Sequence, residues 1–167
     1  MSVVAVKIEE GEITIGADSY VGFGDASQLK NHVKLVECNG LVMGSVGYAK
    51  DLSLIRLYAM THKPKSSSEE GITEFISEFV EWNKKKFDDY HLDSWFIIVF
   101  EGRAFLATHD FYVKRVIDYE SIGAGMNFAM TALKLGKNVE EAIDIACEMC
   151  IYCEKPIRIL KIREAKE

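Results

Sequence analysis

Two stretches of the sequence hold residue types that can do covalent or metal chemistry. Ser2 follows Met1 directly, at the start of an alternating apolar run, so it is either an ordinary strand residue or the reactive end of the molecule. The second stretch is CEMCIYCEKP, in which Cys147, Cys150 and Cys153 are spaced C-x-x-C-x-x-C. Iron–sulfur proteins use cysteines at this spacing as cluster ligands.

The sequence around the cysteines favours buried thiols over a cluster. The preceding segment NVEEAIDIA opens with a capping-box pattern and continues with apolar residues at helical spacing, which predicts a helix over about 138–153. Cysteines at every third position of a helix fan across one side and do not wrap around a cluster, and no fourth cysteine lies nearby in the sequence. We therefore predict small thiols buried in a helix.

Composition and charge limit the class of protein. The chain has 167 residues, 49% of them hydrophobic, which suits a single domain, 1–167, with one buried core. The net charge of −6 argues against nucleic acid or an anionic membrane as a partner, because both require clustered Lys and Arg. No apolar stretch is long enough to cross a bilayer, and no signal peptide pattern follows Met1, so we expect a cytoplasmic protein.

The order of the predicted elements indicates the fold. The strand-like runs VVAVKI, EITIGA, HVKLVE and GLVMGSV precede predicted helices at about 50–61 and 69–87. The pattern then returns with WFIIVF, RAFLAT, FYVKRVI and SIGAG, followed by helices at about 126–136 and 138–153 and a last strand, PIRILKI. Four strands and two helices, twice over, predict an α+β fold: a four-layer αββα sandwich of two antiparallel sheets with helices outside.

Several segments, taken together, resemble a known superfamily. GADSYVGFGD, NHVKLV, GSVGYA, IGAGMNFAMTAL and AIDIACEMCIY are similar to segments of proteasome β-subunits, and most of all to the bacterial HslV-type peptidase subunit. The similarity runs through nearly the whole chain, in order and with few gaps. It implies the fold of an N-terminal nucleophile (Ntn) hydrolase, in which the first residue of the mature chain supplies both the attacking hydroxyl and, through its α-amine, the base.

The resemblance implies a catalytic set. The nucleophilic threonine of the family falls on Ser2, its acidic residue on Asp18, its lysine on Lys34, and its oxyanion-binding glycine on Gly44. An α-amine has a pKa of about 7.7–8.0, so part of it is neutral near pH 7 and able to accept the hydroxyl proton. A lysine ammonium beside that amine lowers its pKa further and stabilises an alkoxide, while an aspartate holds the lysine in place.

The resemblance also implies a substrate pocket and an ion site. The residues at the positions that line the first substrate pocket in relatives are Val21, Val42 and Val46, which would make a small apolar pocket. In HslV-type subunits main-chain carbonyls bind a monovalent or alkaline-earth cation, and the equivalent carbonyls belong to Cys147, Cys150 and Cys153. No cofactor is expected for catalysis.

Two departures from the family bear on activity. Relatives carry a serine that hydrogen-bonds the terminal amine, and the chain has Ala124 in that place, within Gly123-Ala124-Gly125. An amide nitrogen linked to Met1 is not basic, so this mechanism requires Met1 to be removed.

Three functions are therefore open. The favoured one is a peptidase subunit of a homo-oligomeric ring, most simply stacked hexamers, that cuts unfolded polypeptide delivered by an AAA+ ATPase. The others are a catalytically silent ring-forming relative and an Ntn hydrolase of a small amide.

Overall fold

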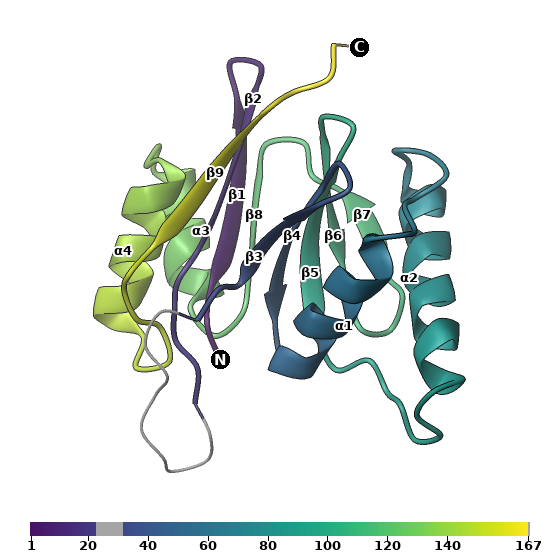
Figure 1. Ribbon diagram of the computed structural model, residues 1–167. Helices are drawn as coiled ribbons and strands as arrows, with labels where there is room; N and C mark the ends of the chain where they lie inside the picture. The colour runs from purple at the N-terminus through teal and green to yellow at the C-terminus, as the bar shows by residue number, and fades with distance from the viewer. Residues whose placement is uncertain (23–31, 167) are drawn as a thin grey trace.

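The computed structural model describes residues 1–22 and 32–166. The end of GADSYVGFGD and the first residue of NHVKLV, two of the segments that carry the resemblance, fall outside the described residues. The described chain forms two antiparallel sheets packed face to face, each covered on its outer side by two helices (Figure 1). The predicted four-layer sandwich is confirmed.

The first sheet has the strand order β8-β1-β2-β9, and the second has the order β3-β4-β5-β6-β7. The first is built from β1 (Val4–Glu9), β2 (Glu12–Ala17), β8 (Tyr119–Ile122) and β9 (Arg158–Arg163). The second is built from β3 (Leu35–Cys38), β4 (Leu41–Val46), β5 (Trp95–Phe100), β6 (Arg103–Ala107) and β7 (Val113–Arg115). The two repeats of the sequence pattern therefore do not correspond to the two sheets. The first hairpin, β1 and β2, pairs with β8 and β9 from the second half of the chain.

Tight two-residue turns set the register of three hairpins. The turn residues Glu10-Gly11, Asn39-Gly40 and Glu101-Gly102 all have positive φ, the geometry of a type I′ turn. This turn matches the right-handed twist of the strands it joins, and glycine occupies its second position without steric cost. The first hairpin pairs Ile8 with Ile13, which brings Ala17 opposite Val4 at the other end.

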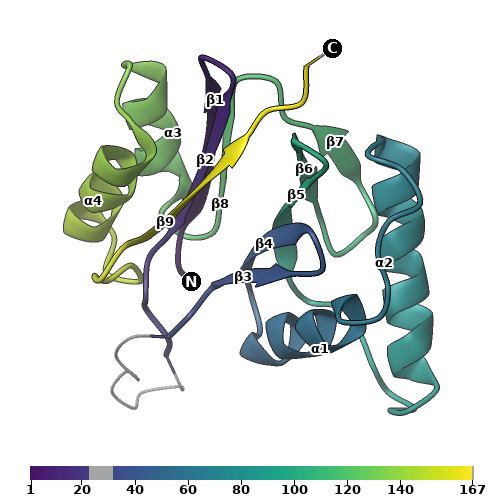
Figure 2. The same ribbon diagram turned by 45° about the horizontal axis from the view of Figure 1, so that its top comes forward.

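The four helices close the outer faces of the sheets. Helices α1 (Ala49–Ala59) and α2 (Glu69–Lys84) cover the second sheet, and α3 (Met126–Lys134) and α4 (Val139–Met149) cover the first (Figure 2). The predicted capping box at the start of α4 is present, with Asn138 and Glu141 bonded reciprocally. Within the described residues, no helix is long and apolar enough to span a membrane.

The predicted ends of several elements were wrong. Helix α4 ends at Met149: Cys150 takes an extended conformation (φ −113°, ψ 118°), so Cys153 lies outside the helix. The backbone turns there because a hydrogen bond from the Cys153 N–H to the Cys150 carbonyl (3.0 Å) replaces the helical pattern. Helix α2 ends at Lys84, three residues earlier than predicted, and β3 begins at Leu35.

Candidate active site

Ser2 lies at the end of the first sheet and is buried although it is the second residue of the chain. Its N–H donates to the Tyr152 carbonyl at 2.9 Å, and its own carbonyl accepts the Gly125 N–H at 3.1 Å. Its hydroxyl donates to the Tyr20 carbonyl at a long 3.4 Å. Ser2 is thus held by backbone groups from distant parts of the chain, which fixes where its nitrogen and hydroxyl point.

An ion pair between Lys34 and Asp18 lies beside Ser2. Asp18 directly follows β2, and its Oδ1 accepts hydrogen bonds from Lys34 Nζ at 2.6 Å and from the Val3 N–H at 3.0 Å. Its Oδ2 accepts two more backbone N–H groups, from Tyr20 and from Glu154, both at 3.1 Å. The carboxylate therefore ties together the first strand, the Lys34 side chain and the segment after α4.

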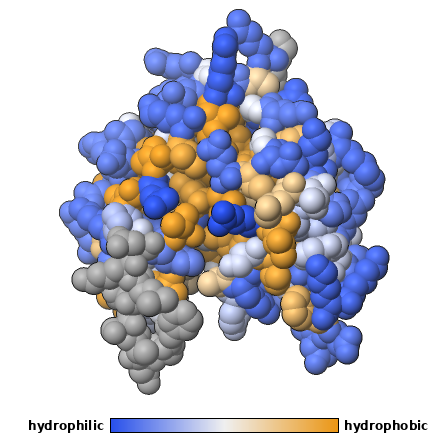
Figure 3. Space-filling model, in the orientation of Figure 1, coloured by the Kyte–Doolittle hydropathy of each residue, from blue (hydrophilic) through white to orange (hydrophobic). Residues whose placement is uncertain are grey.

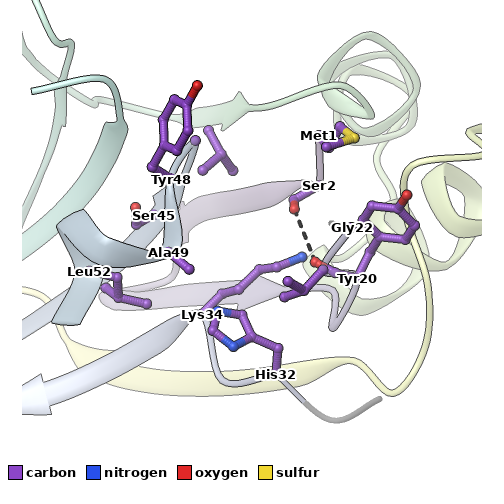
Figure 4. Close-up of a pocket in the computed structure, with 13 residues that line it drawn as sticks. Met1, Ser2, Tyr20, Gly22, His32, Lys34, Ser45, Tyr48, Ala49 and Leu52 are labelled. Atoms are coloured by element: carbon purple, nitrogen blue, oxygen red, sulfur yellow. Dashed lines mark hydrogen bonds between the residues drawn. The ribbon is translucent and has the colours of Figure 1, made fainter. Parts of the chain in front are cut away.

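Both members of this pair are almost completely buried. Burial lowers the pKa of the Lys34 amine, and the charge and hydrogen bond of Asp18 oppose this effect. The Lys34 side chain points toward Ser2 (Figure 4). The structure thus brings together Ser2, Asp18 and Lys34, which lie far apart in the sequence.

A cavity of about 530 Å³ opens beside the Ser2 hydroxyl. It is lined by Ser2 and Lys34 together with Met1, Tyr20, Val21, Gly22, His32, Ser45, Val46, Gly47, Tyr48, Ala49 and Leu52. Hydrophobic surface gathers at the centre of this face of the molecule, inside a hydrophilic rim (Figure 3). The cavity lining is mostly apolar and includes the polar side chains of Ser2, His32, Lys34 and Ser45, which suits an extended chain with an apolar side chain.

The structure places the three predicted pocket valines differently. Val21 and Val46 line the cavity. Val42 is not among the lining residues, because it packs in the core between the sheets, where it pairs with Val99 of β5. Leu52 of α1 lines the cavity as well.

Gly44 lies within β4, paired with Leu35 on one side and Ile97 on the other. A Cβ at this position would lie 2.6 Å from the Val4 side chain, so glycine is required there for the close approach of the two sheets. Gly44 is not among the residues that line the cavity, whereas its neighbours Ser45, Val46 and Gly47 are. Its role as an oxyanion donor stays a prediction.

The three cysteines lie at the end of α4 and in the turn that follows. Burial raises the pKa of the Cys147 thiol to about 12, and burial is likewise the main cause that raises the pKa of Cys153. The Cys150 carbonyl already accepts the Cys153 N–H, and a carbonyl oxygen has a second lone pair for a cation. No group of three or more His, Cys, Asp or Glu side chains suited to a metal occurs in the described part of the chain.

Sequence reasoning missed two contributors to the site. His32 lines the cavity, and burial together with the Lys34 charge lowers the pKa of its imidazole, so it is neutral near pH 7. Its position two residues before Lys34 in an extended segment was an available signal, because alternate residues of such a segment share a face. The Tyr152 carbonyl, which accepts the Ser2 N–H, had no signal because any residue supplies a carbonyl.

The contact between Gly123 and Ser2 gives a testable prediction. Gly123 has φ +100°, and a Cβ there would lie 2.3 Å from the Ser2 carbonyl oxygen. Gly136 has a similar φ of +87° but open space around it, so Gly136→Ala is a matched control for the backbone conformation alone. We expect Gly123→Ala to destabilise the protein by about 1–3 kcal/mol more than Gly136→Ala, measured by urea unfolding, because overpacking adds to the strain. Equal losses of stability in the two variants would mean that the protein accommodates a Cβ at position 123 without additional cost.

Comparison with solved structures identifies the fold. The Thiobacillus denitrificans protein BPH, solved in complex with epoxomicin, matches with a TM-score of 0.89 at 15% identity, over 98% of this chain and 100% of that one. HslV from Trypanosoma brucei matches with a TM-score of 0.69 at 16% identity, over 97% and 99% of the two chains. These matches show that the chain has the Ntn-hydrolase fold.

Among curated proteins, the chain is similar to ATP-dependent protease subunits. It is 29% identical to the subunit HslV of Campylobacter lari over 166 residues, which cover 91% of each chain. It is 28% identical to HslV of a Nitratiruptor species over 169 residues, which cover 93% of each. No family model matches the chain.

Proposed function

We propose that the chain, after removal of Met1, is an N-terminal nucleophile peptidase with Ser2 as the attacking residue. One observation carries this proposal: the Ser2 hydroxyl borders an apolar cavity while the buried Lys34–Asp18 pair, 2.6 Å between Nζ and Oδ1, lies beside it. The similarity to HslV, whose curated name is that of a protease subunit, supports the same reaction.

The reaction follows from the groups around Ser2. Ser2 Oγ attacks the carbonyl carbon of the scissile peptide bond while its proton passes to the free α-amine. The tetrahedral intermediate collapses when the amine returns the proton to the leaving nitrogen, which leaves an ester on Ser2. Water, deprotonated by the same amine, then attacks the ester and releases the acyl product.

Each neighbouring group has a defined part in this cycle. The Tyr152 carbonyl, 2.9 Å from the Ser2 nitrogen, orients the amine after Met1 is lost. The Lys34 ammonium disfavours a charged amine nearby and stabilises the negative charge that develops on Ser2 Oγ. Asp18 holds Lys34 and, through the Val3 N–H, the strand that carries Ser2.

The conformation of Ser2 supports the removal of Met1. Ser2 has φ +96°, a region that residues other than glycine rarely adopt and that costs about 1–3 kcal/mol. The angle φ is defined by the preceding carbonyl carbon, so this strain exists only while Met1 is attached. Met1 also lines the cavity, where it takes space that a substrate would use.

The substrate we propose is unfolded polypeptide, delivered by an AAA+ ATPase to a ring of identical subunits. The apolar cavity accepts one side chain of an extended segment and offers few groups that would select a particular small molecule. The four cysteines are free thiols, which suits a reducing compartment such as the cytoplasm. We also propose that a structural monovalent or alkaline-earth cation binds to the main-chain carbonyls of Cys147, Cys150 and Cys153.

Assembly gives a direct prediction. We expect the purified protein to form closed rings, most simply two stacked hexamers, because proteases of this kind enclose their active sites and cyclic symmetry closes the interface. Light scattering at micromolar concentration measures this. A mass equal to one 18.8 kDa chain would contradict it.

The alanine in place of the family serine gives another prediction. Ala124 is exposed and lies between Gly123, which packs on the Ser2 carbonyl, and Gly125, which donates to that carbonyl. Ala124→Ser adds a hydroxyl that can hydrogen-bond the α-amine, so we expect peptide cleavage to rise about 3- to 10-fold, the effect of one hydrogen bond of about 1 kcal/mol. The measurement is kcat/KM on a fluorogenic peptide. An unchanged rate would mean that the Tyr152 carbonyl already orients the amine fully.

The experiment that tests the proposed function is intact mass before and after reaction with an electrophilic peptide probe. We expect the mass of residues 2–167, increased by one probe molecule, with the modification on Ser2. A chain that begins at Ser2 and stays unmodified would favour the silent ring-forming relative. Modification of Ser2 without digestion of an unfolded protein would favour a small-amide hydrolase.

A further inference from the structure

The turn that follows α4 holds two cysteines, one at each end. The Cys153 N–H donates to the Cys150 carbonyl at 3.0 Å, which closes a four-residue turn over Cys150, Ile151, Tyr152 and Cys153. The sequence of the turn is C-x-x-C, the spacing found in redox-active dithiols. Peptidase chemistry at Ser2 has no use for these thiols.

The turn has the dimensions that a disulfide needs. The first and last Cα atoms of such a turn lie within about 7 Å of each other, and disulfides span Cα separations of about 4.4–6.8 Å. The side chains of Cys150 and Cys153 interact in the structure, and both cysteines are reduced. Cys150 is partly exposed, whereas Cys153 is buried.

The same turn is attached to the nucleophile at several points. The carbonyl of Tyr152, between the two cysteines, accepts the Ser2 N–H, and the Tyr152 ring packs edge-on against Tyr20 with the ring centroids 6.3 Å apart. The N–H of Glu154, the next residue after the turn, donates to Asp18. The Cys153 Sγ lies 2.7 Å from where a Cβ on Gly125 would stand, and Gly125 donates to the Ser2 carbonyl.

We propose that Cys150 and Cys153 form a redox modification site, in which a disulfide across the turn displaces the Tyr152 carbonyl from the Ser2 nitrogen and switches off Ser2 chemistry. The disulfide does not depend on the proposed peptidase function, but its effect on activity does. The oxidant is a peroxide, and a thiol reductant reverses the modification.

The chemistry balances in two steps. The Cys150 sulfur attacks one oxygen of hydrogen peroxide, an S–O bond forms as the O–O bond breaks, and the products are a sulfenic acid and one water. The Cys153 thiol then attacks the Cys150 sulfur, an S–S bond forms as the S–O bond breaks, and a second water leaves. Two thiols lose two electrons and two protons, and peroxide is reduced to two waters.

The effect on Ser2 follows from geometry. The S–S bond of about 2.05 Å and its preferred dihedral angle fix the side-chain torsions of Cys150 and Cys153, so the peptide planes between them must adjust to the disulfide. Tyr152 lies between the two cysteines, and a displacement of about 1 Å at a reacting group is enough to cost up to 100-fold in rate. We expect the oxidised protein to react with the peptide probe at least about tenfold more slowly than the reduced protein.

The experiment treats the assembled protein that begins at Ser2 with hydrogen peroxide and compares each variant with its own reduced form. Peptide mapping by mass identifies the disulfide, and probe labelling and amide hydrogen exchange of the first strand report on Ser2. Cys150→Ser removes the partly exposed thiol of the site. Cys153→Ala removes the buried thiol without placing a hydroxyl in the interior, which could disturb folding. Cys147→Ser, three residues earlier, and Cys38→Ser, on β3, keep the turn intact as matched controls.

The expected result is a Cys150–Cys153 disulfide in the unmodified sequence and in both controls, with slower labelling and faster exchange at the N-terminus, all reversed by dithiothreitol. In Cys150→Ser and Cys153→Ala, peroxide should change neither readout. The absence of this disulfide in the folded protein overturns the proposal, as does a disulfide that leaves both labelling and exchange unchanged. If peroxide forms the disulfide and changes amide hydrogen exchange, but the probe does not label Ser2 even in the reduced protein, the proposed function alone is overturned.

Discussion

A form of the protein that keeps Met1, or any residue before Ser2, will not cleave peptides, and the same protein cut to begin at Ser2 will. The reason is that the nitrogen of Ser2 is the base of the reaction, and a peptide nitrogen is planar and non-basic. The measurement uses a removable N-terminal fusion, so that one preparation is assayed before and after cleavage on an unfolded protein. We expect a gain of at least about 1,000-fold, because loss of a catalytic base or nucleophile typically costs this much or more.

Two variants of Ser2 are the matched controls for this experiment. Ser2→Ala in the trimmed form should be folded and inactive, since it keeps the amine and loses only the hydroxyl. Ser2→Thr should stay active, because threonine keeps the hydroxyl and restores the methyl group that relatives carry. Cleavage by Ser2→Ala, or labelling of a chain that still carries Met1, would show that another residue attacks the substrate.

Replacing Asp18 by asparagine will destabilise the protein by about 3–5 kcal/mol at pH 7, because it leaves the buried Lys34 ammonium without its counter-charge. The amide also accepts hydrogen bonds at only one of its two polar atoms, so at least one of the backbone N–H groups of Val3, Tyr20 and Glu154 loses its acceptor. Urea unfolding at a series of pH values measures this.

The pH dependence of Asp18→Asn has a defined sign. Burial lowers the folded-state pKa of Lys34, and replacing Asp18 removes the largest of the effects that oppose this shift. The folded state then releases the Lys34 proton at a lower pH than the unfolded state, so the unfolded state holds more protons in that window and stability rises with pH. Because the pKa of Lys34 is already lowered in the parent protein, we expect the loss caused by Asp18→Asn to shrink only between the folded-state pKa of Lys34 in the variant and its higher folded-state value in the parent, both of which lie below 10.5.

The double variant Asp18→Asn/Lys34→Met separates stability from catalysis. It replaces the buried charge by an apolar side chain of similar length, and such replacements are often neutral or stabilising. We expect it to recover most of the stability lost in Asp18→Asn without recovering peptide cleavage, because the ammonium beside Ser2 is absent. Recovery of activity in this folded variant would mean that Lys34 has no part in the reaction.

Local patterns in the sequence were sufficient for much of the fold. The alternation of apolar residues predicted the strands of the first and third hairpins, and the two-residue turns with positive φ between those strands fix their register. The helical period of α2 and the capping box of α4 depend on residues within a few positions of each other. Ser2, Asp18 and Lys34 were found through the resemblance to a family, and their convergence was a prediction that the sequence alone did not test.

Only the tertiary structure decided what surrounds Ser2, because each of its neighbours comes from a distant part of the chain and several act through the backbone. The Tyr152 carbonyl and the Gly125 N–H carry no side-chain signature, so no residue pattern could indicate them. The same holds for the pocket: Val42 and Val46 lie on one strand and both pack in the core between the sheets, but only Val46 also lines the cavity. The end of α4 was likewise set by its surroundings, since the turn at Cys150 brings Tyr152 against Ser2 and Glu154 against Asp18, contacts that an uninterrupted helix to residue 153 could not make.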